Sequence, residues 1–126
     1  MSILVDSSIW IDYFRDIGQA DALEFLIEED LLVSNDLILA ELIPPLNIHK
    51  KKDVIKLLRE IKRQPMSIDW DEIIQLQTLC LTKGINGVGI PDLIIVQNAI
   101  QGGLKLLSND KHFSLISKHL PLELFS

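Results

Sequence analysis

The sequence lacks most of the features on which disulfides, membrane anchoring and secretion depend. Its 126 residues include a single cysteine, Cys80, which cannot form an internal disulfide and lies within a helical pattern. We therefore expect a core thiol in a reduced, cytoplasmic protein. No apolar run approaches the ~18 residues needed to span a membrane. The chain also does not open on a basic segment followed by an apolar stretch, so we expect no signal peptide.

Several familiar catalytic and metal-binding motifs are also missing. The three histidines, His49, His112 and His119, are not spaced as zinc ligands. The Gly-Val-Gly of residues 87–89 lacks the following Gly-Lys-Ser/Thr of a phosphate-binding loop. No Gly-x-Ser-x-Gly nucleophile elbow occurs either. These absences argue against a zinc enzyme, a P-loop nucleotide-binding protein and a serine hydrolase of the α/β type.

Charge is unevenly distributed along the chain. The formal net charge of −6 argues against a general affinity for nucleic acid. Residues 1–49 are acidic, and Arg15 is their only lysine or arginine. More than half of the twelve lysines and arginines of the chain lie in residues 50–63. Within that segment a basic stripe recurs at helical spacing, formed by Lys52, Lys56, Arg59 and Arg63. The stripe is either an ordinary solvated helix face or a contact for a nucleic-acid backbone.

Short apolar runs alternate with helical patterns along the chain. We expect strands at residues 4–5, 31–33, 66–68 and 105–107, with a last edge strand at 122–124. We expect helices at residues 8–15, 19–29, 34–42, 51–64, 70–83 and 91–101, and one more helical turn at 115–119. Two prolines, Pro44 and Pro45, should end the third helix, and Asp69 with Glu72 should form a capping box before the fifth. The alternation predicts one α/β domain over residues 1–126, with a parallel sheet covered by helices on both faces.

Most of the eighteen acidic residues lie on solvated faces of the predicted helices, but four do not. Two of the four, Asp6 and Asp110, directly follow predicted strands. In open α/β sheets, ligands bind outside the carboxyl ends of such strands. The alternative for Asp6 is a helix cap, worth about 1 kcal/mol, and the alternative for Asp110 is a turn residue. If Asp6 serves a site, Ser7 or Ser8 should cap the helix instead.

The other two acids, Asp92 and Glu41, lie within predicted helices. Asp92 is in a first helical turn, where the helix dipole favours an acid by about 0.3–1 kcal/mol. Glu41 lies mid-helix among apolar residues, where neither a cap nor a turn explains it. Because an unpaired carboxylate in apolar surroundings costs several kcal/mol, we expect Glu41 to need partners. The alternatives are that it faces a narrow strip of solvent or pairs with Arg15 or a lysine.

Taken together, the four acids predict a metal site. Strand ends and helices that open toward the same edge of the sheet would bring the carboxylates together, and converging carboxylates repel one another. A divalent cation removes this conflict, and hard oxygen ligands without cysteine or histidine select Mg²⁺ or Mn²⁺. Such a cation serves phosphoryl chemistry, because it polarises a phosphate and neutralises charge during displacement. We therefore expect metal-dependent cleavage of phosphodiester bonds.

Four segments carry a resemblance to a known family. They are residues 5–14 (Val-Asp-Ser-Ser-Ile-Trp-Ile-Asp-Tyr-Phe), 39–42 (Leu-Ala-Glu-Leu), 91–95 (Pro-Asp-Leu-Ile-Ile) and 107–113 (Leu-Ser-Asn-Asp-Lys-His-Phe). In this order they resemble the PIN-domain ribonucleases, and most closely the VapC-type toxins of prokaryotic toxin–antitoxin pairs, over essentially the whole chain. The resemblance implies a three-layer α/β/α sandwich with a central parallel sheet of four to five strands.

The same resemblance implies an activity and its residues. It implies an endoribonuclease dependent on Mg²⁺ or Mn²⁺, whose catalytic residues and metal ligands are Asp6, Glu41, Asp92 and Asp110. Asp6 and Asp92 would be the main ligands. Three further positions match polar residues that support the ligands, namely Ser8, Ser108 and Asn109. A cognate antitoxin that masks the active site, and a homodimer, are also implied.

One departure from the family concerns His112. Many relatives carry a further acid at this position, two residues after Asp110, and a neutral imidazole is a poor Mg²⁺ ligand. The case for a second metal ion is therefore weaker. His112 either contacts an RNA phosphate or lies on the surface, and the basic stripe is a further candidate for RNA contacts. Three other functions stay open: a non-catalytic PIN-fold module that binds RNA or protein, a nuclease of RNA processing without an antitoxin, and cleavage of DNA or a small phosphoester.

Overall fold

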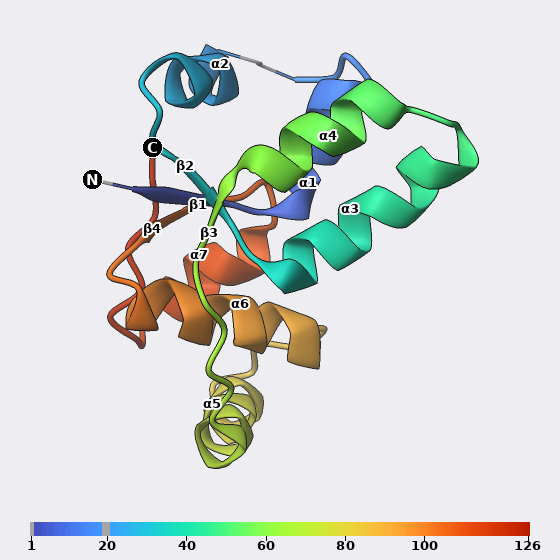
Figure 1. Ribbon diagram of the computed structural model, residues 1–126. Helices are drawn as coiled ribbons and strands as arrows, with labels where there is room; N and C mark the ends of the chain where they lie inside the picture. The colour runs from blue at the N-terminus through green and yellow to red at the C-terminus, as the bar shows by residue number, and fades with distance from the viewer. Residues whose placement is uncertain (1, 19–20) are drawn as a thin grey trace.

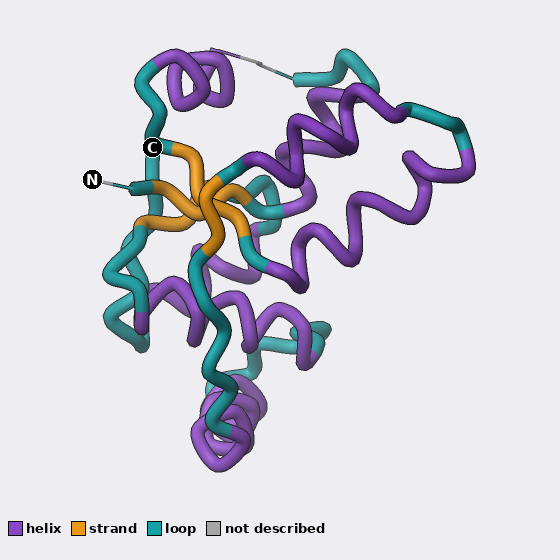
Figure 2. The backbone as a smooth tube through the Cα atoms, viewed as in Figure 1, coloured by secondary structure: helices purple, strands orange, loops and turns teal. Residues whose placement is uncertain are grey.

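The computed structural model describes residues 2–18 and 21–126, and its centre is a parallel β-sheet (Figures 1 and 2). Four strands make up the sheet: β1 (Ile3–Val5), β2 (Leu32–Ser34), β3 (Lys62–Arg63) and β4 (Lys105–Leu107). Their order is β3-β2-β1-β4, and every pair is parallel. The central strand β1 is wholly buried. The predicted α/β class with a parallel sheet is confirmed, and all four strands end at the same edge.

Seven helices surround the sheet within the described residues. They are α1 (Ser7–Phe14), α2 (Asp21–Glu28), α3 (Asp36–Ile48), α4 (Lys52–Glu60), α5 (Trp70–Thr82), α6 (Ile90–Gln101) and α7 (Lys111–Ser117). In Figure 1, α1 and α4 lie on one side of the strands, and α6 and α7 lie on the other. The sheet is therefore covered on both faces, as an α/β/α sandwich requires. The first two residues of the helix predicted at 19–29 lie outside the described residues.

The third strand is not where the sequence predicts it. We expected a helix through residue 64 and a strand at 66–68, but α4 ends at Glu60 and the strand is Lys62–Arg63. Ile61 is extended, with φ −66° and ψ 139°, and the next two residues pair with Val33 and Ser34 of β2. The free edge of β2 thus takes up backbone groups that a longer helix would have used. Arg63 consequently leaves the helix on which the basic stripe was predicted.

The prediction that Pro44 and Pro45 end the third helix is wrong. Helix α3 continues through both prolines to Ile48, and the N–H of His49 still reaches the carbonyl of Pro45 at 3.1 Å. A proline ring holds φ near its helical value but lacks the N–H that would bond the carbonyl four residues earlier. Those carbonyls belong to Ala40 and Glu41, which are exposed, so water can satisfy them.

The C-terminal segment also differs from its prediction. A helix, α7, occupies residues 111–117, where we expected a loop to residue 113 and a helical turn at 115–119. The last edge strand is reduced to one parallel bridge between Leu106 and Leu124. Two backbone hydrogen bonds flank it, from the N–H of Leu106 to the carbonyl of Glu123 and from the N–H of Phe125 to the carbonyl of Leu106.

Of two other local predictions, the capping box before α5 is confirmed in part and the core position of Cys80 is confirmed. Asp69 precedes α5, and its side chain accepts a hydrogen bond from the N–H of Glu72 at 3.2 Å. The Glu72 carboxylate does not complete the capping box, because it accepts from Gln97 Nε2 of α6 at 2.7 Å. Cys80 lies in the core at 2 % exposure, and burial raises the pKa of its thiol. Of the helices in the described residues, none has the length and apolar content needed to cross a membrane.

A buried amide pair ties the two helical layers together through the sheet edge. Asn35, which follows β2 and caps α3, donates to Asn98 Oδ1 of α6 at 2.9 Å. Asn98 in turn donates to the carbonyl of Pro65 at 3.0 Å, and both asparagines are at most 2 % exposed. Because α6 carries Asp92 and α3 carries Glu41, this pair sets the distance between two of the predicted site acids.

Replacing Asn98 by alanine should therefore destabilise the protein strongly. The change leaves the buried Asn35 amide without its partner and removes the hydrogen bond to the Pro65 carbonyl, which we expect to lower the free energy of unfolding by about 2–4 kcal/mol in urea titrations. Gln101→Ala is the matched control, because it removes one hydrogen bond, to the Ser67 carbonyl, from the exposed face of the same helix. Its loss should stay below about 1 kcal/mol. Equal losses for the two variants would contradict this role for Asn98.

Candidate active site

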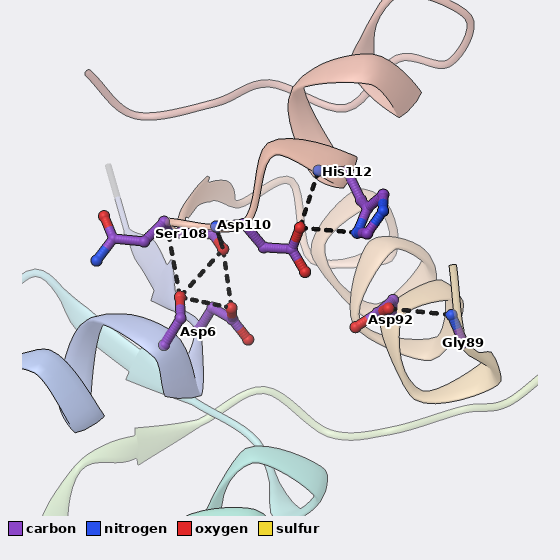
Figure 3. A network of polar contacts seen from close by, with 8 residues as sticks. Asp6, Gly89, Asp92, Ser108, Asp110 and His112 are labelled. Carbon is purple, nitrogen blue, oxygen red and sulfur yellow. Dashed lines mark hydrogen bonds and ion pairs between the residues drawn. The ribbon is translucent and has the colours of Figure 1, made fainter. Parts of the chain in front are cut away.

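Asp6 stands where β1 ends and α1 begins, and its carboxylate is buried at 6 % exposure. It occupies the N-cap position of α1, but its side chain makes no capping hydrogen bond. The carboxylate instead accepts the hydroxyl groups of Ser8 at 2.9 Å and of Ser108 at 2.8 Å, both on Oδ2 (Figure 3). The helix-cap alternative for Asp6 is therefore wrong. The prediction that Ser7 or Ser8 occupies the cap position is also wrong, and the Ser8 hydroxyl is directed at Asp6.

The turn between β4 and α7 brings Ser108, Asn109 and Asp110 to the same edge. Asn109 donates its backbone N–H to Ser8 Oγ at 3.0 Å, and Asp110 donates its backbone N–H to Ser108 Oγ at 3.0 Å. Asp110 itself caps α7, because its Oδ1 accepts the N–H of His112 at 2.9 Å. Asp110 therefore has a local structural role, as the turn alternative predicts. This role uses only one of its two carboxylate oxygens. The three supporting polar residues and the two acids form one network.

His112 lies within this network. Its Nδ1 is 2.9 Å from Asp110 Oδ1, a distance typical of an ion pair when the ring is protonated, although the angle is not that of a hydrogen bond. The other edge of the ring faces the loop before α6, where a Cβ on Gly87 would come within 3.4 Å of Nε2. Gly87 has φ +81°, a conformation that favours glycine. The imidazole is therefore held between Asp110 and this loop, and an RNA contact by His112 stays a prediction.

Asp92 lies in the first turn of α6, as predicted. One carboxylate oxygen accepts the N–H of Gly89 at 3.1 Å, which is half of a capping box. Burial raises the pKa of Asp92, the Gly89 hydrogen bond opposes the rise, and the charges of Asp110 and Asp6 add to it, while His112 lowers it. Asp92 is thus close enough to both strand-end acids to be repelled by them. Figure 3 shows Asp6, Asp92 and Asp110 approaching from three different elements.

Glu41 reaches the same acids from α3. Burial raises its pKa most, followed by the charges of Asp6 and Asp92. Glu41 is exposed, which agrees with the alternative that it faces solvent. It lines a groove with Ile11 and Phe14, and within the described residues it forms no ion pair with Arg15 or a lysine. The solvent-facing alternative therefore holds in part, and the charges of Asp6 and Asp92 add to the effect of burial on its pKa.

The donor chemistry of these acids fits a hard divalent cation. All four offer carboxylate oxygens. Burial raises the pKa of Glu41 and Asp92 most, and the charges of neighbouring acids raise it further, a repulsion that a cation would relieve. Across residues 2–18 and 21–126, however, no three Asp, Glu, His or Cys side chains are already grouped closely enough to hold a metal ion. The side chains share an electrostatic environment without forming a closed ligand cluster.

The basic residues predicted to contact RNA are not part of this arrangement. Lys52, Lys56 and Arg59 lie on α4, and Arg63 lies on β3, so the stripe is not a single helix face. In the part of the chain that the structure describes, no hydrogen bond or ion pair joins any of them to the four acids. Arg63 is paired with Asp36 at 3.1 Å.

One further polar pair was not predicted. Asn109 Nδ2 donates to Asp12 Oδ2 at 2.6 Å, which joins the β4–α7 turn to α1. The only sequence signal for it is an acid on an otherwise apolar helical segment, which also fits a solvated position.

Comparison with known proteins identifies the family of this chain. The family model described as "PIN domain" matches residues 3–119. The chain belongs to the PIN-domain family. Among curated protein sequences none matches it.

Three solved structures, VapBC2, VapBC-1 and FitAcB, are similar to this PIN domain. VapBC2 from Rickettsia felis, bound to a DNA fragment from its promoter, has a TM-score of 0.76 and 20% identity over 99% of this chain and 98% of that chain. VapBC-1 from nontypeable Haemophilus influenzae has a TM-score of 0.74 and 20% identity over 100% and 98%. FitAcB from Neisseria gonorrhoeae has a TM-score of 0.72 and 20% identity over 98% and 96%. At this identity the likeness shows the fold.

The raised pKa values predict how the site affects stability. Between the ordinary pKa of a carboxyl group and its raised value in the fold, the folded state binds more protons than the unfolded chain, so stability falls as pH rises through this window. At pH values above the raised pKa, both states are ionised, and the folded state keeps its full loss of stability. In EDTA at pH 7, Glu41→Gln and Asp92→Asn should therefore raise the Tm by a few degrees, and the gain should shrink at pH 4.

Adding Mn²⁺ should reverse this order, because the wild type keeps the carboxylates that bind the cation. Glu28→Gln, an exposed acid on α2, is the control and should leave the Tm unchanged in both buffers. A lower Tm for both site variants in EDTA would show that the acids do not repel one another.

Proposed function

We propose that this PIN domain is an endoribonuclease dependent on Mg²⁺ or Mn²⁺, and that it is the toxin of a toxin–antitoxin pair. One observation carries the proposal. Asp6 is a buried carboxylate that does not cap its helix, and its charge acts on Glu41 and Asp92, whose pKa values are raised. PIN-domain proteins are typically nucleases, which agrees with such a site.

In this proposal Asp6 and Asp92 are the main metal ligands, and Glu41 and Asp110 complete the set. The chain's own contacts leave oxygens for this role: Ser8 and Ser108 use only Oδ2 of Asp6, and Gly89 uses only Oδ2 of Asp92. The serine hydroxyls hold the Asp6 carboxylate in one orientation, and the His112 N–H holds that of Asp110. When bound, the cation would polarise the scissile phosphate and stabilise the charge that builds up during displacement.

RNA binding would rest on charges outside the acidic site. Lys52, Lys56 and Arg59 are exposed on α4, and His112 lies beside Asp110. Because the chain carries a net charge of −6, we expect weak, salt-sensitive RNA binding until a cation neutralises the carboxylates. Arg63 is a weaker candidate for this role than the three α4 residues, because Asp36 already neutralises it.

An antitoxin partner is supported by the similar complexes and by a groove next to the site. The similar structures are complexes named VapBC2, VapBC-1 and FitAcB. Beside Glu41, α1 and α3 form a groove of about 270 Å³ whose apolar lining includes Ile11, Phe14 and Leu46. A protein segment bound there would cover Glu41 and block access to the acids. We therefore propose that a cognate antitoxin masks this face.

A homodimer is a separate part of the proposal. The outer face of α5 exposes Trp70, Ile74 and Leu81 at 58, 63 and 64 %, and Ile90 at the start of α6 adds to this apolar surface. Exposed apolar patches of this kind on a small protein mark association surfaces. This face is distinct from the groove beside Glu41, so a second copy and an antitoxin could bind at the same time.

Purified protein should cleave structured RNA in Mg²⁺ or Mn²⁺ and not in EDTA. Asp6→Asn and Asp92→Asn should each lower the rate by about a hundredfold or more, because each removes a ligand that positions a charge-stabilising cation. Gel analysis of labelled RNA measures the rate, and Glu28→Gln serves as the control. If both variants cut as well as the wild type, the proposed site is wrong.

The same samples separate the other candidate functions. A non-catalytic binding module would show no cleavage, and calorimetry would detect no heat from specific binding of Mn²⁺. A nuclease for DNA would cut single-stranded DNA of the same sequence as fast as RNA.

Expression of this chain alone should arrest bacterial growth, because an unmasked endoribonuclease destroys essential RNA. The Asp92→Asn variant should be harmless at the same expression level. Co-expression of a small open reading frame found next to the gene should restore growth, as an antitoxin would. Harmless expression of a protein that is active in vitro would count against the toxin role and favour a nuclease of RNA processing.

A further inference from the structure

A cavity of about 360 Å³ opens next to the acidic site, on the opposite side of α1 from the groove beside Glu41. Its apolar walls include Ile9, Tyr13 and Ile17 of the α1 segment and Leu107 at the end of β4. Its two most polar lining residues are Asp12 and Asn109, which are hydrogen-bonded to each other at 2.6 Å. The cavity therefore combines apolar walls with one ordered polar edge.

The polar edge is directly connected to the proposed ligand Asp6. Asn109 donates its side-chain N–H to Asp12 and its backbone N–H to Ser8 Oγ, and Ser8 donates to Asp6. The chain of contacts from the cavity to the buried carboxylate thus passes through only two residues. A group seated in the cavity would therefore contact residues that are linked by hydrogen bonds to the proposed ligand Asp6.

The cavity suits a flat aromatic ring, because the side chain of Tyr13 is part of its lining. Tyr13 is 37 % exposed, and its own ring is ordered by Trp10, at a centroid distance of 6.5 Å and an interplanar angle of 86°, and by Phe14 at 6.1 Å. Unstacked RNA bases bind proteins by stacking on aromatic side chains and by hydrogen bonds to their edges. A cavity of this volume is of the size that holds small ligands.

The polar edge offers two acceptors. A carboxylate cannot donate, so the Asn109 amide must present Nδ2 to Asp12, which leaves Asn109 Oδ1 and the second Asp12 oxygen as acceptors. Guanine has two adjacent donors, N1–H and the N2 amino group. Adenine and cytosine place a ring acceptor beside their amino group, and uracil flanks its one donor with two carbonyl oxygens. Guanine alone presents donors from two neighbouring groups on one edge, so we expect it to match the two acceptors best.

We propose that this cavity is a base-recognition subsite that prefers guanine in the nucleotide adjacent to the scissile phosphate. Asp12 and Asn109 read the edge of the base, and Tyr13 stacks on its face. The inference rests on the proposed ribonuclease function, and it adds residues that determine where the RNA is cut.

The test uses four labelled heptamers, 5′-UUUXUUU-3′, in which X is G, A, C or U. In Mg²⁺ the wild type should cut beside X about tenfold faster when X is G than when X is U. Asp12→Asn replaces one acceptor by a donor of the same shape and should abolish this preference. Tyr13→Leu keeps an apolar wall and should slow all four substrates alike. Asp16→Asn is the control, because Asp16 lies in the same turn region outside the cavity lining and asparagine tolerates its φ of +54°.

Binding of the same heptamers, measured by fluorescence anisotropy in an Asp92→Asn background, gives a second readout. If the wild type cuts none of the RNAs but binding still favours G, and Asp12→Asn removes that preference, the ribonuclease proposal fails and the subsite stands. If Asp12→Asn leaves both the cleavage and the binding preference for G unchanged, the subsite proposal is overturned. The proposal is equally overturned if cleavage by the wild type and RNA binding by the Asp92→Asn variant both show no base preference.

Discussion

Repulsion among carboxylates at one edge of the sheet is the constraint on which the rest of the molecule depends. Asp6 and Asp110 follow neighbouring strands, so parallel pairing of β1 with β4 brings them together whatever the side chains prefer. Asp92 and Glu41 add charge from the two helical layers, and their pKa values are raised by burial first and then by the neighbouring acids. A fold that maintains this arrangement without a cation needs compensating contacts elsewhere.

Those contacts come from neutral polar groups placed around the acids. Two serine hydroxyls share one oxygen of Asp6, and the same hydroxyls accept the backbone N–H groups of Asn109 and Asp110. Each serine therefore both donates to a carboxylate and accepts from the turn that carries another acid. Farther from the acids, the buried Asn35–Asn98 pair holds α3 and α6 at a set separation. The result is a site whose side chains are ordered before any ligand binds.

What the sequence predicts well is local, and what it misses depends on distant partners. The cap at Asp69 and the strand at 105–107 follow from adjacent residues, and both are confirmed. Strand β3 forms only because β2 has a free edge, and no pattern within residues 62–63 indicates this. The position of Glu41 was predicted from an apolar helix, yet its exposure depends on where α1 packs. The Asp12–Asn109 pair joins residues ninety-seven positions apart, which no local signal reveals.

The division between the acids and the neighbouring cavity follows from the chemistry that each can perform. A set of carboxylates with a cation recognises a phosphate, and every phosphate along an RNA strand is the same. Such a site has no means of choosing where to cut, so choice must come from groups that meet a base. In this chain Asp12 and Asn109 form a polar pair that lines a cavity and is linked to Asp6 through Ser8. The backbone N–H of Asn109 donates to Ser8 beside the acids, and its side-chain amide donates to Asp12 at the cavity. In the function proposed for this PIN domain, that single residue couples the placement of the base to the orientation of the carboxylate at the reacting phosphate.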